Sequence, residues 1–132
     1  MRVMIDTNVL ISALLFPNER MNALIYAITQ KHQLVLSSYV VEELLAVTRR
    51  KFPQKTGIVD TLLSALPYEL AYTPQEMEAG LFEIRDEKDY PVLYSAITED
   101  VDILITGDRD FLDIDIERPE IFTPAQFMEL HG

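Results

Sequence analysis

The sequence contains no cysteine, and its basic residues are few. The absence of cysteine excludes disulfides, zinc–thiolate sites and thiol nucleophiles, and it suits a reducing cytoplasm. Lysine and arginine number 11 against 22 aspartates and glutamates, so the formal net charge is −11. A chain this acidic does not attract a polyanion over long range. If the substrate is a nucleic acid, cations or local basic patches must overcome the charge.

Long hydrophobic runs are also absent. No apolar stretch approaches the roughly 20 residues that a membrane-spanning helix requires, so we expect no membrane association. The apolar first 16 residues are interrupted by Asp6, Asn8 and Ser12, which argues against a signal peptide and for a cytoplasmic protein. With 132 residues, of which 48% are hydrophobic and 25% charged, the chain is expected to form one globular domain over residues 1–132.

Strand-type and helix-type patterns alternate along the chain. Strands are predicted over residues 2–6, 33–37, 68–72, 102–106 and 120–122. Helices are predicted over residues 8–15, 20–31, 38–51, 57–66 and 90–97, with others opening at Thr73 and Thr123. This alternation predicts a three-layer α/β/α fold with a mainly parallel central sheet.

Capping residues mark several of the predicted helix starts. Thr73-Pro74-Gln75-Glu76 has the capping-box pattern with proline at the first helical position, and its helix is expected to end near Gly80. Thr123-Pro124-Ala125-Gln126 has the same pattern for the terminal helix. Ser37 or Ser38 can cap the helix over 38–51.

Acidic residues stand where predicted strands end and predicted helices begin. Asp6 follows the first strand, Asp89 precedes the helix over 90–97, and Asp108 follows the strand over 102–106. Because strand carboxyl ends and the helix N-termini that follow lie on one side of a parallel sheet, these three residues should converge. Each also has an ordinary explanation, since aspartate is a preferred N-cap and Gly-Asp is common in turns.

The helix over 38–51 carries a fourth candidate acid. At 100° per residue its apolar face consists of Val40, Val41, Leu44, Val47 and Thr48. Glu42 points nearly opposite this face and should be solvated, whereas Glu43 lies at its edge and can reach inward. Arg50 follows on the same edge two turns later, within the one basic cluster of the chain.

Carboxylates that lie close together cannot all stay ionised unless a positive charge lies among them. A divalent cation is the simplest source of that charge, and all-oxygen ligation suits Mg²⁺ or Mn²⁺. One or two such ions can activate water and stabilise the leaving oxygen of a phosphoryl displacement.

Four segments, taken in order, resemble a PIN domain, and more closely the PIN-type toxins of bacterial and archaeal toxin–antitoxin pairs. They are Ile5–Ser12, the helix of Glu43, Arg85–Asp89 with Pro91-Val92-Leu93, and Leu104–Phe111. The resemblance extends to the terminal Thr-Pro-x-x-Phe. It implies a metal-dependent ribonuclease that leaves 5′-phosphate and 3′-hydroxyl ends, is inhibited by a partner antitoxin and is commonly a homodimer.

The same resemblance assigns roles to individual residues. It implies an acidic metal site at Asp6, Glu43, Asp89 and Asp108, with Asn8 and Thr106 as supporting polar residues. Asp110 could share or take over the role of Asp108. Arg109 is a candidate to contact phosphate or balance the acids, and Arg50 to contact the RNA backbone. The alternative for the basic cluster around Arg50 is a solvated helix C-terminus, where cations complement the helix dipole.

The sequence lacks a residue that each of two other enzyme classes requires. A phosphatase of the haloacid-dehalogenase type needs a second aspartate two residues after the first, where Asn8 stands. A phosphoryl-accepting receiver domain needs a lysine on a late strand, and no lysine follows Lys88. The alternative from a different class is a non-catalytic PIN-like module for protein binding or dimerisation, in which the acids are incidental.

Overall fold

The computed structural model describes residues 1–84, 86–108, 111 and 114–132. Among these residues one sheet is formed, with the strand order β3-β2-β1-β4-β5 and every neighbouring pair parallel. The strands are β1 (Arg2–Ile5), β2 (Gln33–Ser37), β3 (Glu69–Ala71), β4 (Ile103–Ile105) and β5 (Glu120–Phe122). The parallel sheet predicted from the sequence is therefore confirmed.

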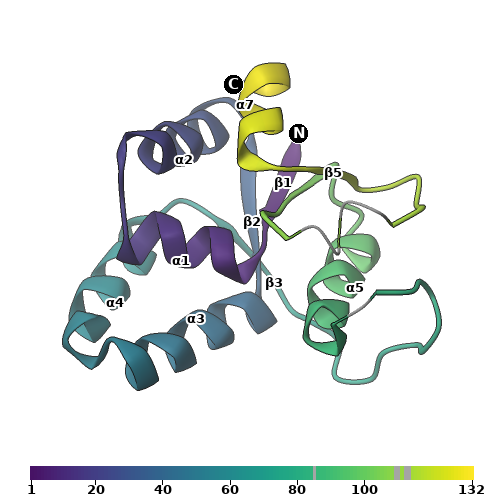
Figure 1. Cartoon of the computed structure of the whole chain (residues 1–132), viewed down its shortest axis with the longest axis horizontal. Helices are drawn as coiled ribbons and strands as arrows, with labels where there is room; N and C mark the ends of the chain where they lie inside the picture. The colour runs from purple at the N-terminus through teal and green to yellow at the C-terminus, as the bar shows by residue number, and fades with distance from the viewer. Residues whose placement is uncertain (85, 109–110, 112–113) are drawn as a thin grey trace.

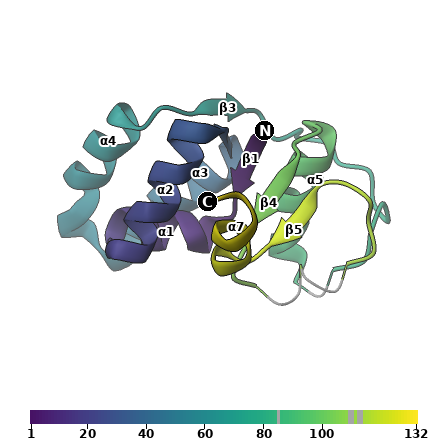
Figure 2. The same ribbon diagram turned by 90° about the horizontal axis from the view of Figure 1, so that it is seen from above.

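Helices cover both faces of this sheet, as Figures 1 and 2 show. On one face lie α1 (Thr7–Leu15), α2 (Glu19–Lys31), α3 (Ser38–Lys51), α4 (Thr56–Ala65) and α7 (Pro124–His131). On the other lies α5 (Tyr90–Thr98), preceded by the short 3-10 helix η2 (Glu87–Asp89); a second one, η1 (Pro53–Lys55), joins α3 to α4. Among the described residues, no helix is long and apolar enough to cross a membrane.

The strand order explains this division into three layers. From β1 to β2 to β3 the chain steps outward in one direction, and right-handed crossovers then place α1 to α4 on a single face. From β3 it returns past β1 to β4, so the same handedness puts α5 on the opposite face. The three-layer α/β/α architecture predicted from the alternating pattern is confirmed.

The middle of the sheet forms the core because helices cover it on both sides. Side chains of the central strands are buried whichever face they point to, which accounts for the continuous apolar runs in the sequence. The fully buried apolar ones are Val3, Met4, Ile5, Leu34, Val35, Leu36, Ile103, Leu104 and Ile105. A rigid sheet centre fixes the carboxyl ends of β1 and β4, which lie side by side.

Side-chain caps begin the helices that leave this edge of the sheet. Ser37, rather than Ser38, caps α3 by accepting a hydrogen bond from the Val40 N–H at 3.2 Å. Thr123 and Gln126 form the predicted capping box at the start of α7.

The predicted helix from Thr73 to Gly80 is wrong, because the structure has no helix over residues 72–84. The Thr73 hydroxyl accepts a hydrogen bond from the Tyr39 N–H at 3.2 Å and lies 2.8 Å from the Ser95 hydroxyl. It is therefore engaged by α3 and α5 and does not cap a helix of its own. Gly80 has a φ of 79°, a turn conformation that glycine adopts readily. Tertiary contacts override the local capping pattern here.

Candidate acidic site

The candidate acids meet at the carboxyl edge of the sheet. Asp6 directly follows β1, and Asp108 lies in the turn after the neighbouring strand β4. Asp89 ends η2 at the start of α5, and Glu43 lies on α3. The charges of Asp108 and Glu43 both act on Asp6, and those of Asp108 and Asp6 act on Asp89. The convergence expected from parallel-sheet geometry is thus observed, although the chemical roles of these residues stay predictions.

Asp6 is buried and held by hydrogen bonds to both of its carboxylate oxygens. It is 4% exposed; Oδ1 accepts from the Val9 N–H at 2.9 Å, and Oδ2 accepts from the Thr106 hydroxyl. Burial raises the pKa of Asp6, the two hydrogen bonds lower it, and the charges of Asp108 and Glu43 raise it further. Asp6 therefore does cap α1, as its ordinary explanation requires, but the cap uses only one oxygen.

Thr106 connects the two acids that follow β1 and β4. Its hydroxyl donates to Asp6 and accepts a hydrogen bond from the Asp108 N–H at 3.0 Å. The side chain is fully buried, so neither bond competes with water. The supporting role that the sequence resemblance implies for Thr106 stays a prediction.

Asp89 stands at the N-cap position of α5 without capping it. The side chain makes no capping hydrogen bond, and its Oδ2 is buried without a hydrogen-bond donor among the described residues. Burial raises the pKa of Asp89 to about 7, helped by a hydrogen bond that the protonated form makes with Asp108 and by the charges of Asp108, Asp86 and Asp6. The ordinary explanation as a helix cap therefore does not account for Asp89. Near neutral pH the Asp89 carboxylate is therefore stabilised by binding either a proton or a cation.

Glu43 comes to the site from the partly buried edge of α3. As the helical spacing predicted, Glu42 is exposed and Glu43 is half-buried. Tyr39, one turn earlier, places its hydroxyl 3.3 Å from Glu43 Oε2. Burial and the neighbouring charge of Glu43 raise the pKa of Tyr39 to about 12. Sequence reasoning missed Tyr39, although its spacing of four residues from Glu43 places both on one helix face.

Sequence reasoning also assigned no role to Asp86. Its carboxylate caps η2 by accepting from the Lys88 N–H at 3.0 Å, and its charge contributes to the raised pKa of Asp89. The signal that could have identified it is its place three residues before Asp89 in a turn rich in acids.

The remaining predicted residues lie at the margin of the site or outside the described structure. Asn8 is exposed in the first turn of α1, next to Asp6 in sequence. Arg50 is exposed in the last turn of α3, where its charge complements the helix dipole as the alternative explanation stated. Arg109 and Asp110 lie outside the described residues.

The donors around Asp6 and Asp89 fit a hard divalent cation. The candidate metal ligands are all carboxylate oxygens, which hard cations prefer. Burial and the neighbouring negative charges raise the pKa of both aspartates. One buried oxygen of Asp89 also accepts no hydrogen bond from the described residues. No three His, Asp or Glu side chains in the described ranges form a ready-made set of ligands. Mg²⁺ commonly completes its coordination with water and substrate oxygens, so an incomplete set of protein ligands does not argue against such an ion.

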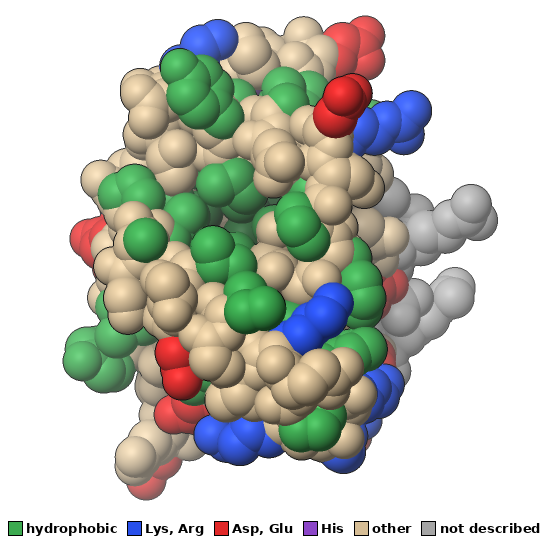
Figure 3. Space-filling view, turned by 90° about the vertical axis from the view of Figure 1, so that its left-hand side faces the viewer, with side chains coloured by type: hydrophobic (Ala, Val, Ile, Leu, Met, Phe, Trp, Pro, Cys, Tyr) green, Lys and Arg blue, Asp and Glu red, His purple; other side chains and the backbone are tan. Residues whose placement is uncertain are grey.

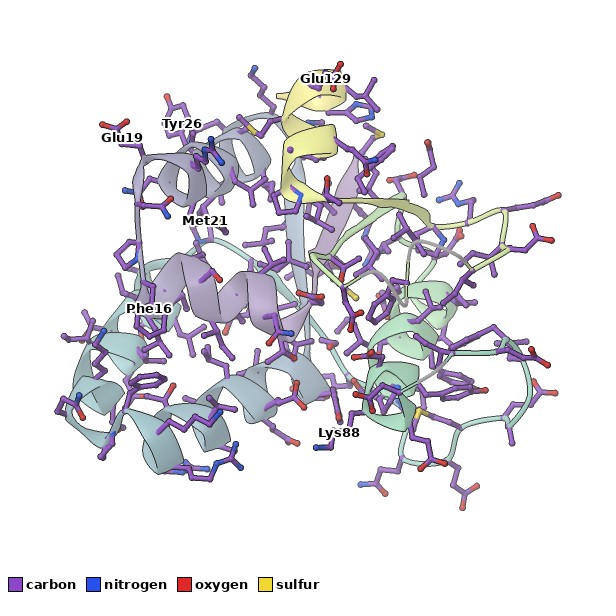
Figure 4. All side chains as sticks on the ribbon, in the orientation of Figure 1. Phe16, Glu19, Met21, Tyr26, Lys88 and Glu129 are labelled. Carbon is purple, nitrogen blue, oxygen red and sulfur yellow. The ribbon has the colours of Figure 1, made fainter. Side chains whose placement is uncertain are left out.

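A separate apolar groove opens between α2 and α4. Its volume is about 390 Å³, and Figure 3 shows hydrophobic side chains gathered around a hollow on this side of the molecule. Its walls include Leu14, Ile25, Tyr26, Leu62 and Leu66. Tyr26 is 67% exposed, and Figure 4 shows it at the outer side of α2. Exposed apolar surface of this kind is typical of protein–protein contacts.

Comparisons with known proteins agree with the architecture. The sequence profile of the PIN-domain family matches residues 2–110. A chain in the crystal structure of VapBC2 from Rickettsia felis bound to a DNA fragment from their promoter superimposes with a TM-score of 0.71. The two chains are 20% identical, and the alignment covers 92% of this chain and 97% of the other. No curated protein matches in sequence.

Proposed function

This chain belongs to the PIN-domain family, and from that premise we propose that it is a divalent-metal-dependent endoribonuclease that hydrolyses RNA phosphodiester bonds. The observation that carries the proposal is the environment of Asp89. This carboxylate does not cap its helix, has a buried oxygen without a donor among the described residues, and has a pKa raised to about 7. A cation bound at Asp89 would account for all three observations, and Mg²⁺ or Mn²⁺ suits the oxygen ligands.

The acids would hold the ion, and the surrounding groups would hold the acids. Asp6, Glu43, Asp89 and Asp108 are the proposed ion-binding residues, with Asp110 as an additional candidate. When bound, such an ion supplies activation of water and neutralisation of charge on the phosphate. The Val9 N–H and the Thr106 hydroxyl orient Asp6 before any substrate arrives, so no reorganisation is needed at that carboxylate. Arg50 and Arg109 are the candidates to contact RNA phosphates.

We extend the proposal to the toxin of a type II toxin–antitoxin pair, acting in the cytoplasm as a homodimer with a cognate antitoxin protein. The similar chain from VapBC2, a complex that is bound to DNA from its own promoter, supports a protein that works with a partner. The apolar groove between α2 and α4 gives a partner protein a surface away from the acids.

The direct test is cleavage of RNA by the purified protein. We expect hydrolysis in Mg²⁺ or Mn²⁺, none with chelator, and a loss of about 100-fold or more in Asp6→Asn, because a bound ion contributes several kcal/mol to transition-state stabilisation. Asparagine is as good an N-cap as aspartate, so α1 should still begin correctly and the variant should remain folded.

Two measurements keep this test decisive. The melting temperature of the wild type should rise in millimolar Mn²⁺, because the ion binds only the native state. Circular dichroism should show that Asp6→Asn melts cooperatively. Equal cleavage by wild type and variant would contradict the proposal. A stable, metal-indifferent protein that cleaves none of several RNAs would favour the non-catalytic binding module.

The neighbouring glutamates of α3 offer a matched pair of variants. We expect Glu43→Gln to lower RNA cleavage by about tenfold or more, because a half-buried carboxylate beside Asp6 loses its charge. Glu42→Gln makes the same chemical change one position away on the exposed side of the helix, and it should leave cleavage within about twofold of wild type. Initial rates at saturating Mn²⁺ measure both; equal losses would refute the helical-face argument.

A further inference from the structure

Glu43 and Asp89 reach the acidic site from elements on opposite faces of the sheet. Glu43 lies on α3, and Asp89 ends η2 immediately before α5 (Figures 1 and 2). Between β3 and η2 the chain runs through a long segment with no helix or strand among its described residues, over 72–84 and at 86. The place of η2 relative to α3 is therefore fixed by the packing of α5, into which η2 runs directly, and by contacts that η2 itself makes with α3.

The hydroxyl of Tyr39 lies between these two elements. It is 3.3 Å from Glu43 Oε2 and 3.1 Å from the carbonyl oxygen of Lys88, the residue before Asp89. A phenol has a single O–H, so this proton is shared between one carboxylate on α3 and one backbone acceptor in η2. Figure 4 shows Lys88 where the chain passes between the first turn of α3 and the start of α5.

The main chain at Tyr39 is itself held in place. Its N–H donates to the Thr73 hydroxyl at 3.2 Å, and the Thr73 N–H donates to the Ser38 hydroxyl at 2.9 Å. The Thr73 hydroxyl also lies 2.8 Å from the Ser95 hydroxyl of α5. The first turn of α3 is thereby tied to the segment after β3 and to α5. A side chain anchored in this way can hold its neighbours to within the tolerance that a site requires.

We propose that Tyr39 is a positioning residue of the acidic site, whose hydroxyl sets the spacing between the Glu43 carboxylate and the η2 backbone that carries Asp89. The inference rests on the proposed function in treating Glu43 and Asp89 as ion-binding residues. Without the hydroxyl, the ring still fills its place and the chain still folds. The two carboxylates are then less well placed to act on one ion.

Tyr39→Phe tests this directly, with Tyr94→Phe as the matched control. Tyr94 is also a tyrosine whose hydroxyl bonds the backbone, accepting from the Glu78 N–H at 3.1 Å, but this bond joins α5 to the segment after β3 and involves none of the four acids. Calorimetric titration with MnCl₂ should show that Tyr39→Phe binds Mn²⁺ roughly three- to tenfold more weakly, the size expected for one lost hydrogen bond. Tyr94→Phe should bind within about twofold of wild type.

If Tyr39 only stabilised the fold, Tyr39→Phe would melt at a clearly lower temperature than Tyr94→Phe. A positioning role predicts a local effect on η2 instead. In metal-free protein, Tyr39→Phe should speed amide hydrogen exchange over residues 86–90 while melting within a degree or two of Tyr94→Phe. Equal Mn²⁺ affinity of Tyr39→Phe and wild type, or equal weakening in both variants, overturns the inference.

The titration requires no RNA, so it separates this inference from the proposed function. If the wild type binds Mn²⁺ and Tyr39→Phe binds it more weakly, yet no RNA is cleaved, the nuclease proposal fails and the positioning role stands. If the wild type binds no Mn²⁺, both are overturned.

Discussion

Replacing Asp89 with asparagine should lower RNA cleavage by about 100-fold or more and at the same time raise the melting temperature of the metal-free protein. Cleavage falls because the proposed ion loses the carboxylate with the buried, donor-free oxygen. Stability rises by a few degrees because the asparagine side chain carries no charge, whereas the Asp89 carboxylate is opposed by burial and by nearby acids. Opposite effects on activity and stability are expected where a site is assembled from groups that repel one another.

The same variant should change how stability depends on pH. The pKa of Asp89 is raised from its ordinary 3.8 to about 7 in the folded protein. Between these values the native state retains a proton that the unfolded state has released, so the free energy of unfolding falls as pH rises from about 4 to about 7. Asp6, whose pKa is also raised, acts in the same direction. The lowered pKa of Asp102 has the opposite sign, but its contribution is complete above its ordinary value of 3.8 and does not oppose the trend in this window.

Thermal melts in chelator provide the measurement. Wild type should melt at a lower temperature at about pH 7.5 than at about pH 5.5, and Asp89→Asn should show a weaker dependence over the same range. Glu42→Gln, which neutralises an exposed acid of the same protein, should retain the wild-type trend. An Asp89→Asn protein that melts below wild type at neutral pH would show that the carboxylate stabilises the fold, contrary to this account.

The placement of the acids could be predicted from the sequence because it depends on short-range rules. Asp6 comes directly after β1, Asp108 lies in the turn that follows β4, and the parallel sheet brings these strand ends to one edge. Helical periodicity places Glu43 at the edge of the buried face of α3 and its neighbour Glu42 on the exposed side. Each of these inferences needs only a short local pattern and one general property of the fold.

What could not be predicted depends on contacts between distant residues. The Tyr39 hydroxyl meets the Lys88 carbonyl across 49 positions of sequence, and no local pattern records that contact. The helix predicted for the segment after β3 was wrong for the same reason. Thr73 has the local pattern of a helix cap, yet its hydroxyl is hydrogen-bonded to the Tyr39 N–H and to the Ser95 hydroxyl. Hydroxyl side chains can satisfy either local or distant partners, and the choice is made by the packing of the whole chain.

Thr106→Val should lower the free energy of unfolding by about 2 to 3 kcal/mol, because valine keeps the shape but leaves the buried Asp6 Oδ2 without a donor and the Asp108 N–H without its acceptor. The loss of that donor should also raise the pKa of Asp6 further, since the Thr106 hydrogen bond is the largest influence holding it down. A proton would then compete more strongly with a cation for Asp6, so Mn²⁺ should bind more weakly.

Denaturant unfolding and calorimetric titration with Mn²⁺ test both consequences, with two controls. Thr106→Ser restores the hydroxyl and should recover Mn²⁺ affinity to within about threefold, while losing about 1 kcal/mol for the missing methyl group. Thr61→Val makes the same chemical change at an exposed helix position, where the hydroxyl bonds the Gly57 carbonyl, and should stay within about 0.5 kcal/mol of wild type. If Thr106→Val is no less stable than Thr61→Val, the link from Thr106 to Asp6 does not organise the site. If Thr106→Ser binds Mn²⁺ as weakly as Thr106→Val, packing rather than the hydroxyl is responsible.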